Sequence, residues 1–237
     1  TDPVTGKTYT VYNQTNPGED HYLITNPEKG KDIGQAYPDI VSVTPDRKYR
    51  AFQISINKRM SNNWQLFLSY VYSHEEGSYP NSHAWGHSFD MGRSDIYYDP
   101  NYQINLYGRS SISIPHTFKA QGTFILPLDI ALSAFYTYHS GRTWSRRILV
   151  PGLNQGARII LAEEAGHRRL PATNNLDLRL EKFFPYKNMK FRLMLDCFNV
   201  FNQGRETRVQ DIEGDDFGKP LYVNTPRTLL LSLRFMF

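Results

Sequence analysis

The sequence predicts an all-β fold that forms part of a transmembrane antiparallel β-barrel in the outer membrane of a Gram-negative bacterium. Apolar and polar residues alternate along segments of about 9 to 12 residues, the length at which a tilted strand crosses a bilayer. Short turns and very long connections also alternate along the chain. Aromatic residues make up 14% of the chain although its mean hydropathy is −0.54. A barrel explains that combination, because its rings gather at the two lipid interfaces while its lumen and loops stay polar.

Composition excludes several other classes of protein. The longest apolar runs, such as Leu229 to Leu231, fall far short of a membrane-spanning helix. The 27 basic and 23 acidic residues are interleaved, so nucleic-acid binding is not expected. The single cysteine, Cys197, can form neither an internal disulfide nor a zinc motif. A soluble β-sandwich would also show alternation, but long irregular connections on one side argue against a compact domain.

The expected strands form hairpins, and together they number about seven or eight, as the alternation pattern indicates. A weak first strand is expected at about 7–13. Strands at 52–57 and 64–72 flank a turn at 60–63, strands at 115–126 and 130–138 flank a turn at 127–129, strands at 176–181 and 191–197 flank a turn at 185–188, and a last strand covers 228–237. The last strand is the clearest, since every second residue from Leu229 to Phe237 is apolar.

The turn at 185–188 predicts a register for the hairpin around it. A four-residue turn would pair Phe184 with Met189, which keeps the apolar residues of both strands on one face. That register also sets Asp177 opposite Asp196, an unfavourable pair of like charges.

Connection lengths predict the orientation in the membrane. Short turns near residues 60, 128 and 186 alternate with long segments at about 14–48, 74–114, 141–172 and 202–226. Outer-membrane barrels keep short turns in the periplasm and long loops outside, so the C-terminal residue Phe237 is expected on the periplasmic side. The aromatic residues expected near the periplasmic rim are Trp64, Phe183, Phe184, Phe235 and Phe237, and those near the outer rim are Tyr70, Tyr72, Phe118, Tyr136 and Tyr138.

Several segments between about 47 and 237 resemble one family. They are Lys58-Arg59-Met60-Ser61-Asn62-Asn63-Trp64, Ser69-Tyr70-Val71-Tyr72-Ser73, Ser140-Gly141-Arg142, Leu176-Asp177-Leu178-Arg179, Glu181-Lys182-Phe183-Phe184, Asp196-Cys197-Phe198-Asn199-Val200-Phe201-Asn202 and Leu233-Arg234-Phe235-Met236-Phe237. Together they resemble TonB-dependent outer-membrane receptors, closest to the subgroup with an N-terminal carboxypeptidase-regulatory-like domain. The position of Cys197 is usually aliphatic in the family.

The resemblance implies a barrel of about 22 strands closed by an N-terminal plug. Residues 1–237 would then be the C-terminal segment of the barrel, without the plug and the energy-coupling box. The implied function is active import of a scarce external ligand, driven by the TonB system through the plug. The implied partners are outer-membrane lipid, the barrel-assembly machinery, which reads the C-terminal strand, and in addition a surface lipoprotein.

An alternative function is left open by the strand count. A complete eight-stranded barrel that acts as an adhesin or membrane anchor would also fit the alternation. A passive porin would need a longer chain. No catalytic motif such as Gly-x-Ser-x-Gly or His-Glu-x-x-His occurs, so enzymatic activity is not expected.

Candidate site residues lie in the long loops. Those expected to contact a ligand by stacking are Trp85, Tyr97, Tyr98, Tyr102 and Trp144, although such rings equally pack loops together. A metal set of His74, Glu75, Glu76, His83, His87 and Asp90, and a calcium set of Asp211, Glu213, Asp215 and Asp216, have suitable ligand types. Neither set has the spacing of a known motif, so no metal or cofactor is expected.

Overall fold

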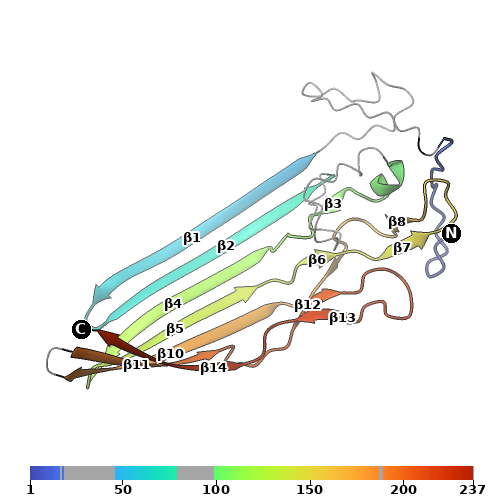
Figure 1. The fold of residues 1–237 in the computed structure, drawn as a ribbon. Helices are drawn as coiled ribbons and strands as arrows, with labels where there is room; N and C mark the ends of the chain where they lie inside the picture. Colours follow the sequence, from blue (N-terminus) through green and yellow to red (C-terminus); the bar gives the residue numbers. More distant parts are fainter. Residues whose placement is uncertain (17, 19–45, 79–98, 187–188, 237) are drawn as a thin grey trace.

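The computed structural model describes residues 1–16, 18, 46–78, 99–186 and 189–236, and seven long strands form its main sheet (Figure 1). These strands are β1 (Arg47–Ser61), β2 (Trp64–Gly77), β4 (His116–Leu126), β5 (Ile130–His139), β10 (Thr173–Tyr186), β11 (Met189–Phe198) and β14 (Thr228–Met236). Each is antiparallel to the next, in the order β1-β2-β4-β5-β10-β11-β14, and the short β3 (Gly108–Arg109) also pairs with β2. The predicted antiparallel all-β fold is therefore confirmed.

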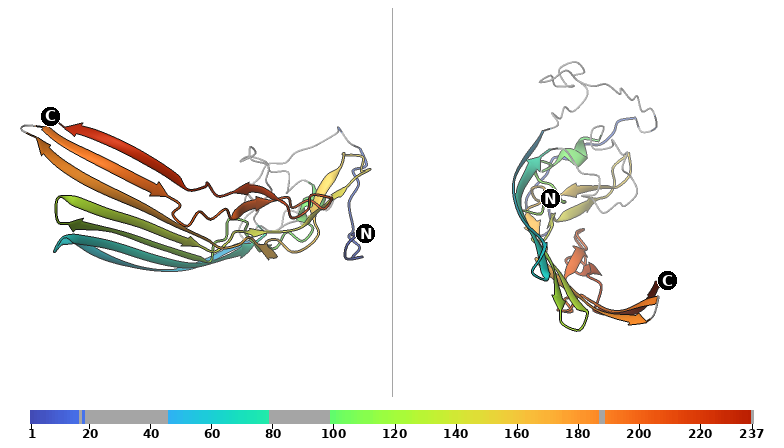
Figure 2. Two further views of the ribbon diagram at one scale, coloured as in Figure 1. Left: turned by 90° about the horizontal axis from the view of Figure 1, so that it is seen from below. Right: turned by 90° about the vertical axis from the view of Figure 1, so that its left-hand side faces the viewer.

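The sheet is a single curved layer with its connections divided between two ends (Figure 2). The short turns and the C-terminus lie at one end, and the long connections lie at the other with the N-terminus. Within the described residues, β1 and β14 each pair on one side only, so they are the edges of the sheet. No helix in the described part of the chain is long and apolar enough to cross a membrane.

One face of the sheet is apolar from β2 to β14. The row Leu66, Gly122, Ala134, Leu178, Cys197 and Leu229 runs through six neighbouring strands. Many side chains on this face are exposed in the isolated chain, and Leu231 retains 69% of its accessible surface. A soluble sandwich would bury such residues against a second sheet, whereas a membrane strand presents them to lipid.

The opposite face is polar, and we call it the inner face because the polar face of a membrane barrel lines its lumen. Its rows contain hydroxyl, amide and charged side chains. One row is Ser55, Ser69, Lys119, Thr137 and Asn175, and the next row toward the long connections is Gln53, Val71, Thr117, His139 and Thr173. The two faces follow directly from the period of two along each strand.

The turns use residues that tolerate left-handed backbone. Asn62 and Asn63 have φ of 51° and 66°, as a tight hairpin between β1 and β2 requires. Leu128 and Asp129 adopt similar values, 65° and 56°, between β4 and β5. The predicted turns near residues 60 and 128 are therefore confirmed, and the asparagines explain the first of them.

The predicted register of the β10–β11 hairpin is wrong by two residues. β10 continues through Pro185, so Tyr186 pairs with Met189 where the sequence predicted Phe184. A shift of two leaves every side chain on its predicted face. It also removes the predicted pair of like charges.

In the observed register, the partner of Asp196 is a cation. Arg179 lies opposite Asp196, and its Nε and Nη2 donate to the two carboxylate oxygens at 2.5 and 3.0 Å. Asp177 instead accepts a hydrogen bond from the backbone N–H of Asn199 at 2.8 Å. The electrostatics of the inner face thus select the observed register over the predicted one.

Aromatic residues gather at the turn end of the apolar face, with one exception. Trp64 stacks on Phe124 at a centroid distance of 6.0 Å, and Phe191 packs edge-on against Phe235 at 5.2 Å. Phe183, expected at this rim, lies on the inner face with the Arg192 guanidinium 4.4 Å from its ring centre. The C-terminal Phe237 lies outside the described residues.

The first 13 residues do not form the weak strand expected at 7–13. They cross the long-connection end of the molecule without regular structure. The backbone N–H and C=O of Tyr12 bond the side chain of Asn101 at 2.8 and 2.9 Å, and the Tyr9 hydroxyl donates to the carbonyl of Ala162 at 2.5 Å. Side-chain hydrogen bonds therefore replace the expected backbone ladder, a preference that alternation alone does not reveal.

Candidate functional site

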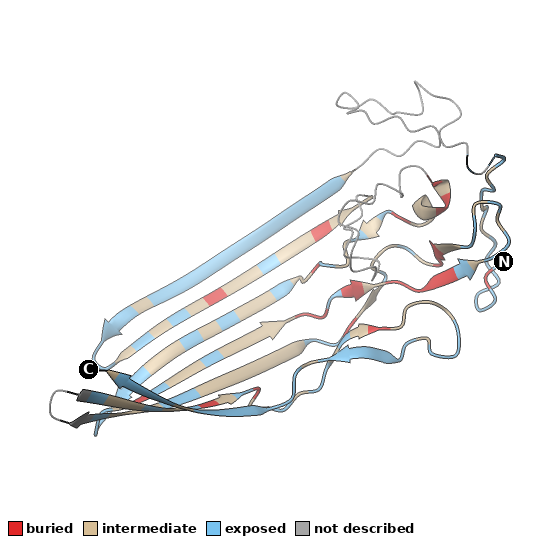
Figure 3. Cartoon of the chain, in the orientation of Figure 1, coloured by how far each residue is buried: buried red, intermediate tan, exposed pale blue. Residues whose placement is uncertain are grey.

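The long connections and the N-terminal segment pack into a layer over one end of the sheet. We call it the loop layer, and it comprises residues 1–16, 99–115, 140–172 and 199–227. Its short elements are the 3-10 helix η2 (Pro100–Gln103), β3, β6 (Thr143–Trp144), β7 (Arg147–Val150), β8 (Arg158–Leu161), β9 (Arg168–Arg169), β12 (Glu206–Val209) and β13 (Pro220–Val223). Most buried residues of the described chain lie in this layer (Figure 3).

A small apolar cluster holds the loop layer together. Ile148, Ile160 and Ala162 are buried on β7, β8 and the residues after them. Tyr9 of the N-terminal segment and Ile104, which follows η2, pack against the cluster. Three segments that are distant in sequence therefore share one core, which positions the polar groups around it.

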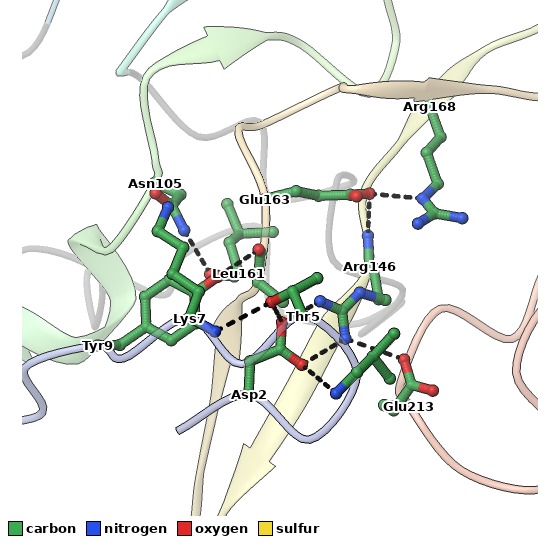
Figure 4. Close-up of polar contacts among 12 residues, drawn as sticks. Asp2, Thr5, Lys7, Tyr9, Asn105, Arg146, Leu161, Glu163, Arg168 and Glu213 are labelled. Carbon is green, nitrogen blue, oxygen red and sulfur yellow. Dashed lines mark hydrogen bonds and ion pairs between the residues drawn. The ribbon is translucent and has the colours of Figure 1, made fainter.

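The centre of the polar groups is Arg146, a buried arginine between two carboxylates (Figure 4). Its guanidinium donates to both carboxylate oxygens of Asp2 and, at 3.1 Å, to Glu213. Asp2 and Arg146 retain 1% and 3% of their accessible surface. The hydrogen bonds from Arg146 hold the pKa of Asp2 well below its usual range, against the opposing effect of burial, and Asp2 raises the pKa of Arg146.

Further ion pairs join the loops around this centre. Arg147 donates to Asp211 at 2.5 Å, Arg158 to Asp99 at 2.5 Å, and Arg168 to Glu163 at 2.7 Å. The first two pairs connect β7 and β8 with loops far away in sequence. A carboxylate with several charge-assisted hydrogen bonds favours one geometry, so these contacts organise the loop layer.

The structure places two of the five candidate stacking residues. Trp144 packs 5.8 Å from Phe217, and the Arg168 guanidinium carbon lies 5.3 Å from the centre of the Trp144 ring and 5.4 Å from that of Phe217. Trp144 thus contacts the loop that follows β11. Tyr102 is half-buried in η2. The other three candidates, Trp85, Tyr97 and Tyr98, lie outside the described residues.

The described members of the two candidate metal sets do not come together as metal sites. Glu75 pairs with Arg47 at 2.7 Å and His74 with Glu76 at 3.2 Å, while His83, His87 and Asp90 lie outside the described residues. In the calcium set, arginine or lysine holds three members, namely Asp211, Glu213 and Asp216. Over the residues that the structure describes, no three metal-ligating side chains come together.

The structure also reveals polar residues that the sequence did not single out as a site. Lys119 and His139 lie on the inner face at the loop end of β4 and β5. Arg142 comes three residues after His139 in the chain. A Cβ on Gly141 would lie 1.7 Å from the carbonyl oxygen of Leu170, so only glycine allows this approach. The resemblance of Ser140-Gly141-Arg142 to a family motif drew attention to this segment, but it did not predict the contact with Leu170 that requires glycine.

Arg169 completes this group from β9. One of its terminal nitrogens donates to the carbonyl oxygens of Gly141 at 2.6 Å and Ser113 at 3.3 Å. Burial, with a smaller effect of Arg109, lowers the pKa of Arg169 from its ordinary value. The guanidinium still stays charged at neutral pH, because the ordinary pKa of arginine is so high.

Comparisons with known proteins identify the family of the wall. A family model described as an outer membrane beta barrel domain matches residues 5–134, which is more than half of the chain. The match extends from the N-terminal segment through β1, β2 and β4 into β5. No curated protein and no solved structure matches the chain.

Proposed function

The chain belongs to the outer membrane beta barrel domain family, and from this premise we propose that it forms part of the wall and outer loops of a TonB-dependent receptor. The receptor takes up a scarce external ligand. A plug domain receives the energy from TonB, and the chain described here contributes barrel strands and the loop layer, with its C-terminus on the periplasmic side.

The open sheet is the observation that most supports a receptor over a complete small barrel. An eight-stranded barrel would require one more long strand, paired with both β1 and β14, and the described residues contain no such strand. A larger barrel instead places further strands at both edges. That arrangement agrees with the wall of about 22 strands that the resemblance implies.

The loop layer gives a second line of support. Buried ion pairs and an apolar cluster order these loops, whereas a membrane anchor needs no such layer. An ordered layer above a polar inner face suits a surface that captures a solute and passes it toward the lumen. Trp144 and Tyr102 lie within the layer, where they can contribute to such a surface.

A paired experiment tests the proposal. The mass of the polypeptide is measured in native outer membranes, and the uptake of isotope-labelled medium solutes is compared in cells that lack this protein, TonB or neither. We expect a chain several times longer than 237 residues and at least one solute whose uptake needs both proteins. A mature polypeptide of about this length, or a deletion that weakens surface adhesion and leaves every TonB-dependent uptake unchanged, would support the small adhesin or anchor instead.

A further inference from the structure

Four cationic or ionisable side chains gather where the inner face meets the loop layer. Lys119, His139, Arg142 and Arg169 form this group, which we call the inner-face cationic patch. On the paired strands β4 and β5, Lys119 lies opposite Thr137 and His139 lies opposite Thr117. All four are odd-numbered positions that alternate with the apolar residues, so Lys119 and His139 are both on the inner face. Lys119 and Arg142 are the two charges that act on the ring of His139. Lys119, His139 and Arg142 therefore share one electrostatic environment, and Arg169 joins them through its hydrogen bond to the carbonyl of Gly141, the residue before Arg142.

Backbone contacts fix two arginines of the patch. The carbonyl of Arg142 accepts a hydrogen bond from the Leu170 N–H at 2.9 Å, and Arg169 is bonded to the carbonyl of Gly141. Both contacts depend on the close approach at Gly141. The fold thus positions the Arg169 guanidinium and the backbone of Arg142 before any ligand arrives, and a positioned group loses less entropy on binding.

The patch has no counter-charge in the described part of the chain. No carboxylate among the described residues forms an ion pair with Lys119, Arg142 or Arg169, and none acts on His139. Elsewhere in the loops and strands, the arginines that have a carboxylate partner include Arg146, Arg147, Arg158, Arg168 and Arg179. Arg109 lies opposite Glu76 in the pairing of β3 with β2 and is not counted in the patch.

Neutral hydrogen-bonding groups surround the cations. The rows that contain Lys119 and His139 also present Ser69, Thr117 and Thr137 on the inner face. Hydroxyl groups and fixed guanidinium groups are the donors that bind carboxylate and phosphate oxygens. No described carboxylate competes for the donors of Lys119 and Arg142, whereas one terminal nitrogen of Arg169 already donates to two backbone carbonyls.

We propose that the inner-face cationic patch binds small solutes that carry two or more carboxylate or phosphate groups, and that it is the first lumen-side contact of such a solute below the loop layer. This inference rests on the proposed receptor function, because it specifies the class of ligand that the receptor takes up. The patch attracts the anion electrostatically, and the arginine forks and hydroxyl groups bind its oxygens.

A binding experiment on the full-length protein in lipid nanodiscs tests this inference. Citrate, pyrophosphate and the neutral sugar maltose are titrated by calorimetry at about 0.15 M salt, where charges further apart than about 8 Å are largely screened. We expect citrate or pyrophosphate to bind and maltose not to bind. Citrate alone would identify polycarboxylates, pyrophosphate alone would identify phosphorylated solutes, and failure of both anions to bind would overturn the proposal.

Variants connect the binding to the patch. The double substitution Lys119→Gln and Arg142→Gln removes two exposed cations without disturbing the apolar face. It should weaken anion binding about tenfold or more, since hydrogen bonds to charged groups contribute more than neutral ones. The matched control is Arg205→Gln, which removes an exposed loop arginine that is not among the charges acting on His139. Equal affinities in both variants would contradict the proposed site.

The experiments distinguish failure of the anion site from failure of the receptor proposal. Anion binding that requires the patch, together with uptake independent of TonB, would keep the site and reject the receptor. TonB-dependent uptake of other solutes, without anion binding to the purified protein, would keep the receptor and reject the site.

Discussion

At the scale of single residues, two buried or crowded positions determine how the loop layer is built. Asp2 fastens the N-terminal segment through a buried ion pair with Arg146, and Gly141 lets two loop segments touch. Neither is visible as a pattern, because each depends on a partner more than 25 residues away in the sequence. The two positions lead to predictions that differ in mechanism.

Docking of the N-terminal segment should be insensitive to pH from 7 down to about 4. The pKa of Asp2 is lowered in the folded protein, so its contribution is complete above the unfolded carboxyl value of about 3.9 and disappears only as pH falls through the folded value. Fluorescence anisotropy of a dye on Thr8→Cys, in a Cys197→Ser background, reports the mobility of the segment. We expect constant anisotropy over this range in the wild-type sequence. An Asp2→Asn variant should give lower anisotropy than the wild type at every pH in this range, although Tyr9 and Tyr12 keep their contacts. A wild-type transition near pH 5 would contradict the assigned ion pair.

Gly141→Ala should displace the segment from Ser140 to Thr143. The new Cβ would lie 1.7 Å from the Leu170 oxygen and 2.4 Å from its carbonyl carbon, and backbone atoms cannot move aside cheaply. We expect faster hydrogen exchange at the Leu170 amide, which donates to Arg142. Gly204→Ala is the matched control, since a Cβ there meets nothing within 4 Å. Equal exchange in the two variants would show that the approach at Gly141 is not required.

At the scale of elements, alternation predicted the hairpins, their faces and the turns near residues 60 and 128, but neither the turn at 185–188 nor the register around it. A register shift of two residues leaves apolar side chains on the same face, so the hydrophobic pattern cannot distinguish Phe184 from Tyr186 as the partner of Met189. The Arg179–Asp196 ion pair distinguishes them. For the N-terminal segment the pattern was misleading, because seven alternating residues can also follow a surface loop.

The register of β10 and β11 can be tested with the native cysteine. Cys197 pairs with Leu178, so the Cα atoms should lie about 4.5 to 5.5 Å apart, within the range that a disulfide bridges. A Leu178→Cys variant, oxidised with membrane-permeable copper phenanthroline, should lose both free thiols. In the register predicted from the sequence, Leu176→Cys would be the variant that crosslinks. Free-thiol labelling and intact mass distinguish the two.

An inserted charge should destabilise the protein much more on the apolar face of β14 than on its inner face. Leu231→Arg places a guanidinium on the lipid side near the middle of the strand and should cost about 2 to 4 kcal/mol in unfolding free energy. Ser232→Arg introduces the same side chain on the inner face and should cost much less. Urea unfolding of the full-length protein in lipid vesicles measures both. Similar losses for the two variants would refute the assignment of faces.

At the scale of the whole molecule, the wall and the loop layer differ in what the sequence can predict. In the wall, every second residue of a strand faces lipid, so the sequence of any one strand is enough to recognise the pattern. The loop layer depends on long-range partners such as Asp2 with Arg146 and Trp144 with Phe217, which no periodicity encodes. The candidate rings Trp144 and Tyr102 were therefore predictable as loop residues, while the cationic patch became visible only through strand pairing.

The proposed orientation, with the short turns in the periplasm and the loop layer outside, can be measured in living cells. Leu128, in the turn between β4 and β5, retains 76% of its accessible surface, and Asp215 is exposed in the loop layer. In a Cys197→Ser background, Asp215→Cys should react with a membrane-impermeant maleimide on intact cells, because long loops of outer-membrane barrels face outward. Leu128→Cys should react only after the outer membrane is permeabilised, since outer-membrane barrels keep their short turns in the periplasm. If Leu128→Cys reacts on intact cells and Asp215→Cys does not, the loop layer faces the periplasm and the patch cannot receive external solutes.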